Sequence, residues 1–167
     1  MDRRRLWEGA IAALVPVAAC SVALAGLTAW AGTGRAGSPA RIEVTEGKVL
    51  LPSAGVPETA AFFHIANTGG AADTLVRITA RDVSGEVTLS RHRMRQGNAA
   101  YGSEVDSVSV AAGDTLAMSP SGLDLTVPVP SGGWRSGDLV SFTLEFRRSG
   151  PVESLAVVVR PGTVSFQ

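Results

Sequence analysis

The sequence divides into one long apolar run near its start and many short alternating runs after it. Ala10–Ala31 contains no charged residue and only a few small polar ones. At about 1.5 Å per helical residue, this run is long enough to cross the roughly 30 Å hydrocarbon core of a bilayer. We therefore predict a helix over residues 1–34 that serves as a transmembrane anchor or a signal segment.

Three fates of this segment are open. Arg3, Arg4 and Arg5 precede the apolar run and favour a cytoplasmic N-terminus, with the rest of the chain outside. The helix can stay as a single-pass anchor in the cell membrane. It can also be cleaved after Ala29-Trp30-Ala31, which would give a secreted protein. Lipidation at Cys20 is the third fate, because Val17-Ala18-Ala19-Cys20 has the form of a lipobox. The span length favours the retained anchor.

The pattern changes after a Gly/Ser/Pro-rich stretch at 35–41, which is typical of a flexible linker. From Ile42 onward, β-branched or aromatic residues alternate with polar ones, and turn clusters such as Asn67-Thr68-Gly69-Gly70 separate the runs. No stretch past Gly34 keeps a 3.6-residue apolar period. Strands are expected at 42–45, 48–51, 60–67, 73–80, 86–94, 107–110, 114–118, 123–129, 139–147 and 152–159.

This series of short strands predicts an all-β fold. About nine strands at this spacing favour an antiparallel two-sheet sandwich of the Greek-key, cupredoxin-like or Ig-like kind. The sequence shows no internal repeat. A single extracytoplasmic domain over 42–167 is therefore expected behind the membrane segment at 1–34 and the linker at 35–41.

Composition and charge exclude several classes of function. From position 36 onward there are 11 basic and 13 acidic residues, so the domain has no electrostatic footprint for nucleic acid. Cys20 is the only cysteine and the chain has two histidines, which excludes a disulfide framework or a Cys/His-rich zinc site in the exported part. There is no nucleophile elbow, phosphate loop or His-Glu-x-x-His motif. We predict that the protein is not an enzyme.

Several stretches occur in an order that matches a known domain. Ala60–Gly69 reads as a strand and turn with Phe62-Phe63-His64-Ile65 and Asn67-Thr68-Gly69. It is followed by Gly85–Leu89, Val110–Thr115, Pro120–Leu123 and a closing hairpin from Asp138. Over roughly residues 42–160 the chain resembles the periplasmic copper chaperone (PCuAC) domain. The resemblance implies that family's fold, a copper cargo, and delivery of copper to a respiratory oxidase or its assembly proteins.

The copper ligands that the resemblance implies are not present. The family signature is His-x10-Met-x21-His-x-Met, a set of imidazole and thioether ligands suited to Cu(I). Carried over one position at a time, with the first Met placed by counting back from the Ala112-Gly113 turn, it falls on Ser90, Gly102, Asp124 and Thr126, which leaves eleven residues rather than ten between the first two positions. Glycine has no side chain, and the other three offer only hard oxygen ligands, which Cu(I) binds poorly.

His92 and Met94 are the remaining candidates for metal ligands. They are two residues apart, so both project from one face of a strand, and Asp124 is expected to approach them from a facing loop. Together the three would form a weak copper site. The alternative is that this strand end is exposed and binds nothing, because three arginines between positions 91 and 95 repel a cation. The small number of soft ligands favours the alternative.

Two hypotheses about function follow from the sequence. The first is a membrane-tethered, extracytoplasmic copper-chaperone-like protein with degenerate metal binding. The second is a metal-free binding or scaffold module that kept the fold and contacts another protein of the cell envelope.

Overall fold

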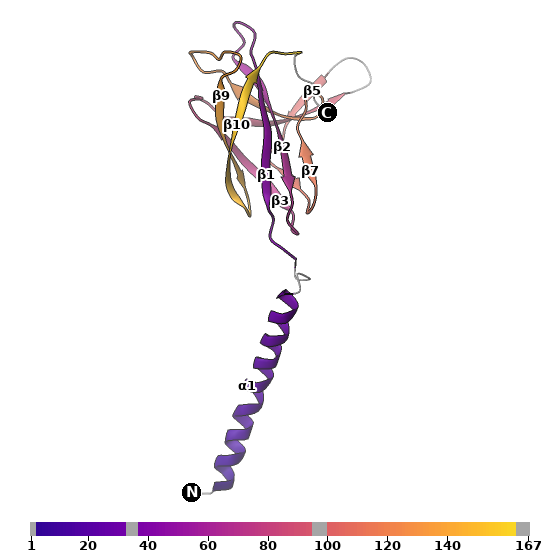
Figure 1. The fold of residues 1–167 in the computed structure, drawn as a ribbon, viewed down its shortest axis with the longest axis vertical. Coiled ribbons are helices and arrows are strands. Elements are labelled where there is room, and N and C mark those ends of the chain that lie inside the picture. Colours follow the sequence, from indigo (N-terminus) through magenta and orange to yellow (C-terminus); the bar gives the residue numbers. More distant parts are fainter. Residues whose placement is uncertain (1–2, 33–36, 95–99, 163–167) are drawn as a thin grey trace. The chain divides into compact units, whose positions relative to one another are not determined.

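The computed structural model describes residues 3–32, 37–94 and 100–162 of the chain. The chain forms two compact units, Met1–Ser38 and Pro39–Gln167 (Figure 1). The first unit contains helix α1 (Arg3–Gly32), with Pro16 inside it. Its stretch Leu14–Ala31 is apolar and long enough to cross a membrane, and none of it is buried in the protein. A signal sequence would have the same properties, so the predicted N-terminal apolar helix is confirmed and its fate remains a prediction.

The second unit consists of strands and turns in its described residues. The strands are β1 (Ile42–Leu50), β2 (Glu58–Asn67), β3 (Asp73–Ala80), β4 (Thr88–Met94), β5 (Ala100–Glu104), β6 (Val108–Val110), β7 (Thr115–Ala117), β8 (Leu123–Pro128), β9 (Leu139–Phe146) and β10 (Gly150–Val159). The all-β prediction for this part of the chain is confirmed. Strand β5 was not predicted, because its sequence Ala-Tyr-Gly-Ser-Glu contains a glycine and no apolar alternation.

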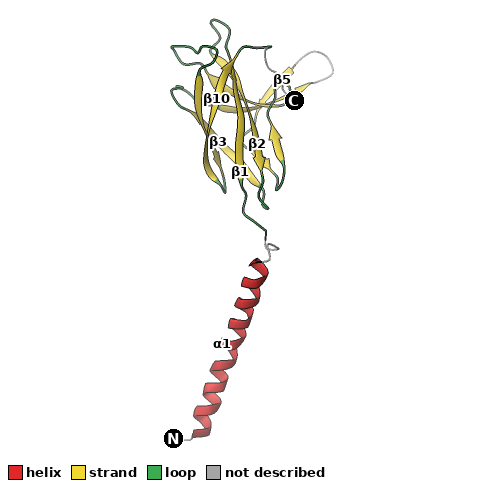
Figure 2. Cartoon of the chain, viewed as in Figure 1, coloured by secondary structure: helices red, strands yellow, loops and turns green. Residues whose placement is uncertain are grey.

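The strands hydrogen bond along one continuous path in the order β5-β4-β8-β2-β1-β10-β9-β3-β6, and β7 pairs with β2. Figure 2 shows this sheet curled on itself like a half-barrel. The prediction of antiparallel pairing throughout is wrong at one place, because β1 and β10 run parallel from Gly47↔Ala156 to Leu50↔Val159. The predicted division into two sheets of Greek-key type is not confirmed. Periodicity along the chain does not reveal that its first and last strands are neighbours.

A bulge in β1 explains why the sequence suggested two runs where the structure has one strand. The register against β2 shifts between Thr45 and Lys48, and Glu46 has a positive φ of 52°. A side chain at Gly47 would collide with the carbonyl oxygen of Leu155 and with the ring of Phe63. Glycine at this position therefore lets β10 approach β1 closely.

The inner face of the curled sheet holds the apolar core. The Phe63 and Phe142 rings meet edge to face with their centroids 5.2 Å apart, a favourable geometry for aromatic pairs. Leu75, Leu125 and Leu144 around them have no exposed surface. Met118 also belongs to this core and is 5% exposed.

Asp73, the first residue of β3, carries a buried carboxylate and is 2% exposed. Its Oδ1 accepts hydrogen bonds from the backbone N–H groups of Thr74 (2.7 Å) and Arg148 (2.9 Å), and its Oδ2 accepts one from that of Ser149 (2.8 Å). Burial alone would raise the pKa of Asp73, but the Ser149 hydroxyl and these N–H groups outweigh it and lower the pKa below its ordinary value. The ionised side chain thus ties β3 to the β9–β10 turn.

We expect Asp73→Asn to lower the free energy of unfolding by about 2–3 kcal/mol at pH 7, because an amide cannot accept all three bonds. A carboxyl with a lowered folded-state pKa stabilises the fold above its unfolded pKa, and this stabilisation is lost as the pH falls through the folded value. The difference between wild type and variant should therefore shrink towards pH 3 in urea unfolding experiments. Asp106→Asn, at an exposed position, should change stability by less than about 0.5 kcal/mol. A constant difference across this pH range would contradict the account.

Candidate functional site

The positions singled out in the sequence lie on three neighbouring strands. Strand β4 lies between β5 and β8, with Ser90 opposite Asp124 of β8 and His92 opposite Gly102 of β5. Residues two apart in a strand share a face, and directly opposite residues share it too. Thr126, two residues after Asp124, completes the set. The register thus brings to one face of the sheet all four positions to which the family signature was carried over, together with His92.

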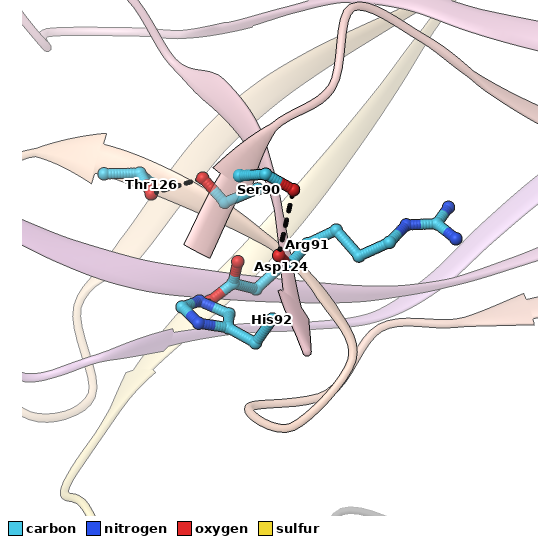
Figure 3. A network of polar contacts seen from close by, with 6 residues as sticks. Ser90, Arg91, His92, Asp124 and Thr126 are labelled. Carbon is cyan, nitrogen blue, oxygen red and sulfur yellow. Dashed lines mark hydrogen bonds and ion pairs between the residues drawn. The ribbon is translucent and has the colours of Figure 1, made fainter. Parts of the chain in front are cut away.

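Two hydrogen bonds connect these side chains across β4 and β8. The hydroxyl oxygens of Ser90 and Thr126 are 3.0 Å apart, and Nε2 of His92 lies 3.1 Å from Oδ2 of Asp124. Figure 3 shows Ser90 facing Thr126, and the His92 ring beside the Asp124 carboxylate. We call Ser90, His92, Asp124 and Thr126 the polar cluster. Within the polar cluster the side chains thus form two separate pairs, Ser90 with Thr126 and His92 with Asp124.

The backbone around the polar cluster fixes its position. The N–H of His92 donates to the carbonyl of Gly122 (2.7 Å), and the N–H of Ser119 donates to the carbonyl of Leu123 (2.9 Å), which closes the turn before β8. Asp124 follows directly as the second residue of β8. The prediction that Asp124 approaches from a facing loop is therefore wrong, because this residue lies in the strand next to His92.

Asp124 is the most buried charged group of the polar cluster. Its side chain is 7% exposed, whereas that of His92 is 33% exposed. Its second oxygen, Oδ1, is buried without a hydrogen-bond partner. Burial raises the pKa of Asp124, and the nearby His92 only partly opposes this effect. The carboxylate is thus poorly solvated, and His92 is the hydrogen-bond partner that stabilises its charge.

Not all candidates can be placed. The backbone of Met94 pairs with Ala100 at the end of β4, but the Met94 side chain lies outside the described residues. The same is true of the Arg93 side chain and of all of Arg95. The Arg91 side chain extends away from the His92 ring (Figure 3), as expected for adjacent residues of a strand.

The polar cluster does not fit Cu(I). Two of its members offer hydroxyl oxygens that already bond to each other, a third offers a carboxylate, and only His92 offers an intermediate nitrogen ligand. Within the described residues, no group of three or more His, Cys, Asp or Glu side chains is placed to hold a metal ion. The cluster also lacks the geometry of a catalytic relay, because the Ser90 hydroxyl bonds to Thr126 and His92 bonds to Asp124.

Comparison with known proteins identifies the domain. A family model with the description "Putative lipoprotein LpqE-like" matches residues 42–159, more than half of the chain. The chain belongs to the LpqE-like family. No curated protein gives a significant match.

Three solved structures similar to this LpqE-like protein are PCuAC domains. The "apo PmoF2 PCuAC domain" has a TM-score of 0.59 and 18% identity, and the match covers 77% of this chain and 97% of that domain. The "Copper-bound PCuAC domain from PmoF2" has a TM-score of 0.59 and 18% identity, covering 74% and 97%. The "Apo PCuAC domain from PmoF1" has a TM-score of 0.60 and 17% identity, covering 74% and 97%. The predicted resemblance to the PCuAC family is confirmed, and at these identities it concerns the fold.

We expect His92→Ala to destabilise the protein by about 1–3 kcal/mol at pH 7, because Asp124 would lose its bonded partner while it stays buried. When the folded-state pKa of a carboxyl is raised, its ionised form lowers the stability of the fold at pH values above that pKa. Protonation at lower pH removes this loss of stability. The loss caused by the substitution should therefore shrink between pH 7 and pH 4.5, measured by urea unfolding. Ser103→Ala, an exposed change on the neighbouring β5, serves as the control. A loss that grows towards acidic pH would contradict this role of His92.

Proposed function

We propose that the protein is a membrane-tethered, extracytoplasmic binding module that keeps the PCuAC fold and does not carry Cu(I). The observation that supports this proposal is the polar cluster, in which Ser90, Asp124 and Thr126 occupy three of the four positions to which the resemblance carries the family's copper ligands. Its hydroxyl and carboxylate oxygens are hard ligands, and its four members form two hydrogen-bonded pairs that a metal would have to break. Without an activated nucleophile in the polar cluster, we also propose a function other than catalysis.

The proposal includes the division of the chain that the sequence predicts. A membrane segment at 1–34 and a linker at 35–41 would precede the binding domain at 42–167. The boundary between linker and domain is supported by Arg41, the last residue of the linker, whose N–H donates to Oδ1 of the buried Asn67 (3.1 Å) and whose carbonyl accepts from the N–H of Thr68 (2.9 Å). These bonds attach the chain to the end of β2 directly before β1.

We propose that α1 is retained as a single-pass anchor with the domain outside the cytoplasm. The helix continues without interruption through Cys20 to Gly32, so a long apolar stretch follows the cysteine. In a lipoprotein cleaved before Cys20, this stretch would remain in the mature exported chain. Its exposed apolar side chains would then need a membrane or a protein surface to cover them. The family description as a lipoprotein, together with the lipobox at Val17–Cys20, supports lipidation as the second candidate.

The intact mass of the protein extracted from membranes should equal that of the chain with α1, without lipid. Cys20→Ala should leave this mass unchanged apart from the substitution, and the variant should stay in the membrane fraction, because the apolar helix alone provides the anchor. A mature chain that begins at Cys20 and carries lipid would contradict the retained anchor. A lipid-free chain that begins after Ala31 in the medium would contradict it as well.

Copper carriage through a modified site is the alternative function. The unpartnered Oδ1 of Asp124 beside His92 favours it, since a metal ion bound there would satisfy this oxygen. Met94 would be the third ligand of this site, and the receiving proteins would be the oxidase assembly proteins that the resemblance implies.

A titration with Cu(I) against a chelator of known affinity separates the two functions. We expect the Cys20→Ala form of the full-length chain, which lacks the soft thiol of the membrane segment, not to compete for Cu(I). Restoring the family ligands should create competition, because the register brings the four positions to one face of the sheet; the variant carries Ser90→His, Gly102→Met, Asp124→His and Thr126→Met.

Two controls make the titration decisive. A variant with only Asp124→His and Thr126→Met should compete much less strongly, because it lacks the ligands from β4 and β5. Tight binding by the Cys20→Ala form that is lost on adding His92→Ala or Met94→Ala would contradict the metal-free module and support copper carriage.

A further inference from the structure

A groove lies between β3 and the segments that flank β4. It encloses a volume of about 610 Å³ and is lined by residues 76–79 of β3, residues 85–89, and residues 104–106. Each lining segment is a run of consecutive residues. Neighbouring residues of a strand point to opposite faces, so the four consecutive lining residues of β3 indicate that the groove runs along the edge of this strand. The groove, called the β3 groove below, is thus bordered by the edge of a strand.

The edge of β3 that borders the groove is not paired with another described strand over residues 76–80. On one side β3 pairs with β9 as far as Ala80, but on the other side β6 pairs with it only from Asp73 to Leu75. No other described strand pairs with that side at residues 76–80. In an antiparallel ladder, alternate residues direct their N–H and C=O groups to each side, so this stretch presents unpaired groups to the groove. Such an edge is a template for an additional strand.

The side chains of the β3 groove provide an apolar floor. Ile78, Val87 and Leu89 are 6%, 6% and 5% exposed, respectively. Leu89 also accepts a backbone hydrogen bond from Val105 (2.8 Å), which fixes the segment 104–106 beside β4. An added strand would therefore meet a preformed floor for the side chains on one of its faces.

The rim of the groove is acidic. Glu86, Glu104 and Asp106 line it and are exposed. The one basic residue among the lining residues, Arg77, faces Glu145 of β9 at 3.9 Å. The excess negative charge attracts cationic side chains. The floor and rim together match a strand that alternates apolar and basic residues.

We propose that the β3 groove binds an extended, basic segment of a partner protein, which adds as a strand to the free edge of β3. This inference rests on the proposed function as a binding module and names the chemistry of its partner. Main-chain hydrogen bonds supply affinity in this mode of recognition, and alternate side chains supply specificity. The groove is lined by none of the residues of the polar cluster, so the two regions can be tested separately.

Binding of a model peptide to the full-length chain in nanodiscs of zwitterionic lipid tests the proposal. The probe is a fluorescent peptide of alternating lysine and valine, and the comparison peptide alternates glutamate and valine. We expect saturable binding of the lysine peptide, and at least about tenfold weaker binding to the triple variant Glu86→Lys, Glu104→Lys and Asp106→Lys. The control variant has the same change of charge at exposed positions outside the groove, Glu43→Lys, Glu58→Lys and Glu153→Lys, and should bind as wild type.

A second measurement separates strand addition from simple charge attraction. Methylation of alternate peptide nitrogens, on the edge that would face β3, should abolish binding because it removes the donors of the new ladder. In the complex with the unmodified peptide, hydrogen exchange of the backbone amides at 76–80 should slow. Equal binding of the methylated peptide, equal binding of the glutamate peptide, or no binding at all would overturn the proposal. Protection of the same amides by self-association of the chain would overturn it too, because the occupant would then be a second copy. The Cu(I) titration tests the metal-free function separately.

Discussion

The parallel pairing of β1 with β10 holds the domain together as one sheet. It joins β2, β8, β4 and β5 on one side to β9, β3 and β6 on the other. The close approach depends on the bulge at Glu46 and on Gly47, where a side chain would meet the β10 backbone. Because this join lies in the middle of the strand order, the sheet can curl until both of its ends contribute to the β3 groove. Both the polar cluster and the groove follow from this arrangement.

The polar cluster places hydroxyl, carboxylate and imidazole groups on the face of the sheet to which the resemblance carries copper ligands. The β4–β8 register keeps the positions together whatever residues occupy them, since strand pairing is a property of the backbone and the core. In this chain the hydroxyls of Ser90 and Thr126 hydrogen bond to each other, and Asp124 and His92 form a partly buried pair. The fold therefore does not determine the cargo, and the function has to be argued from the site.

The sequence predicted the strands well and their neighbours less well. Alternation in runs such as 73–80 follows from local burial, so β3 was expected at its observed bounds. The parallel join was not expected, because it connects residues more than a hundred positions apart. The resemblance correctly brought Ser90 and Asp124 into one region, but the hydrogen bonds of the polar cluster depend on cross-strand register. The β3 groove depends on where β6 stops pairing with β3, which no local pattern indicates.

We propose that hydrogen-bonded oxygen groups between β4 and β8 take the place of the copper ligands that the resemblance implies. Anomalous scattering at the copper edge, from crystals grown with Cu(I) under reducing conditions, tests it most directly. The account predicts no copper peak at this place and an intact contact between the Ser90 and Thr126 hydroxyls. A peak bound by His92 and Asp124, with that contact broken, would contradict it.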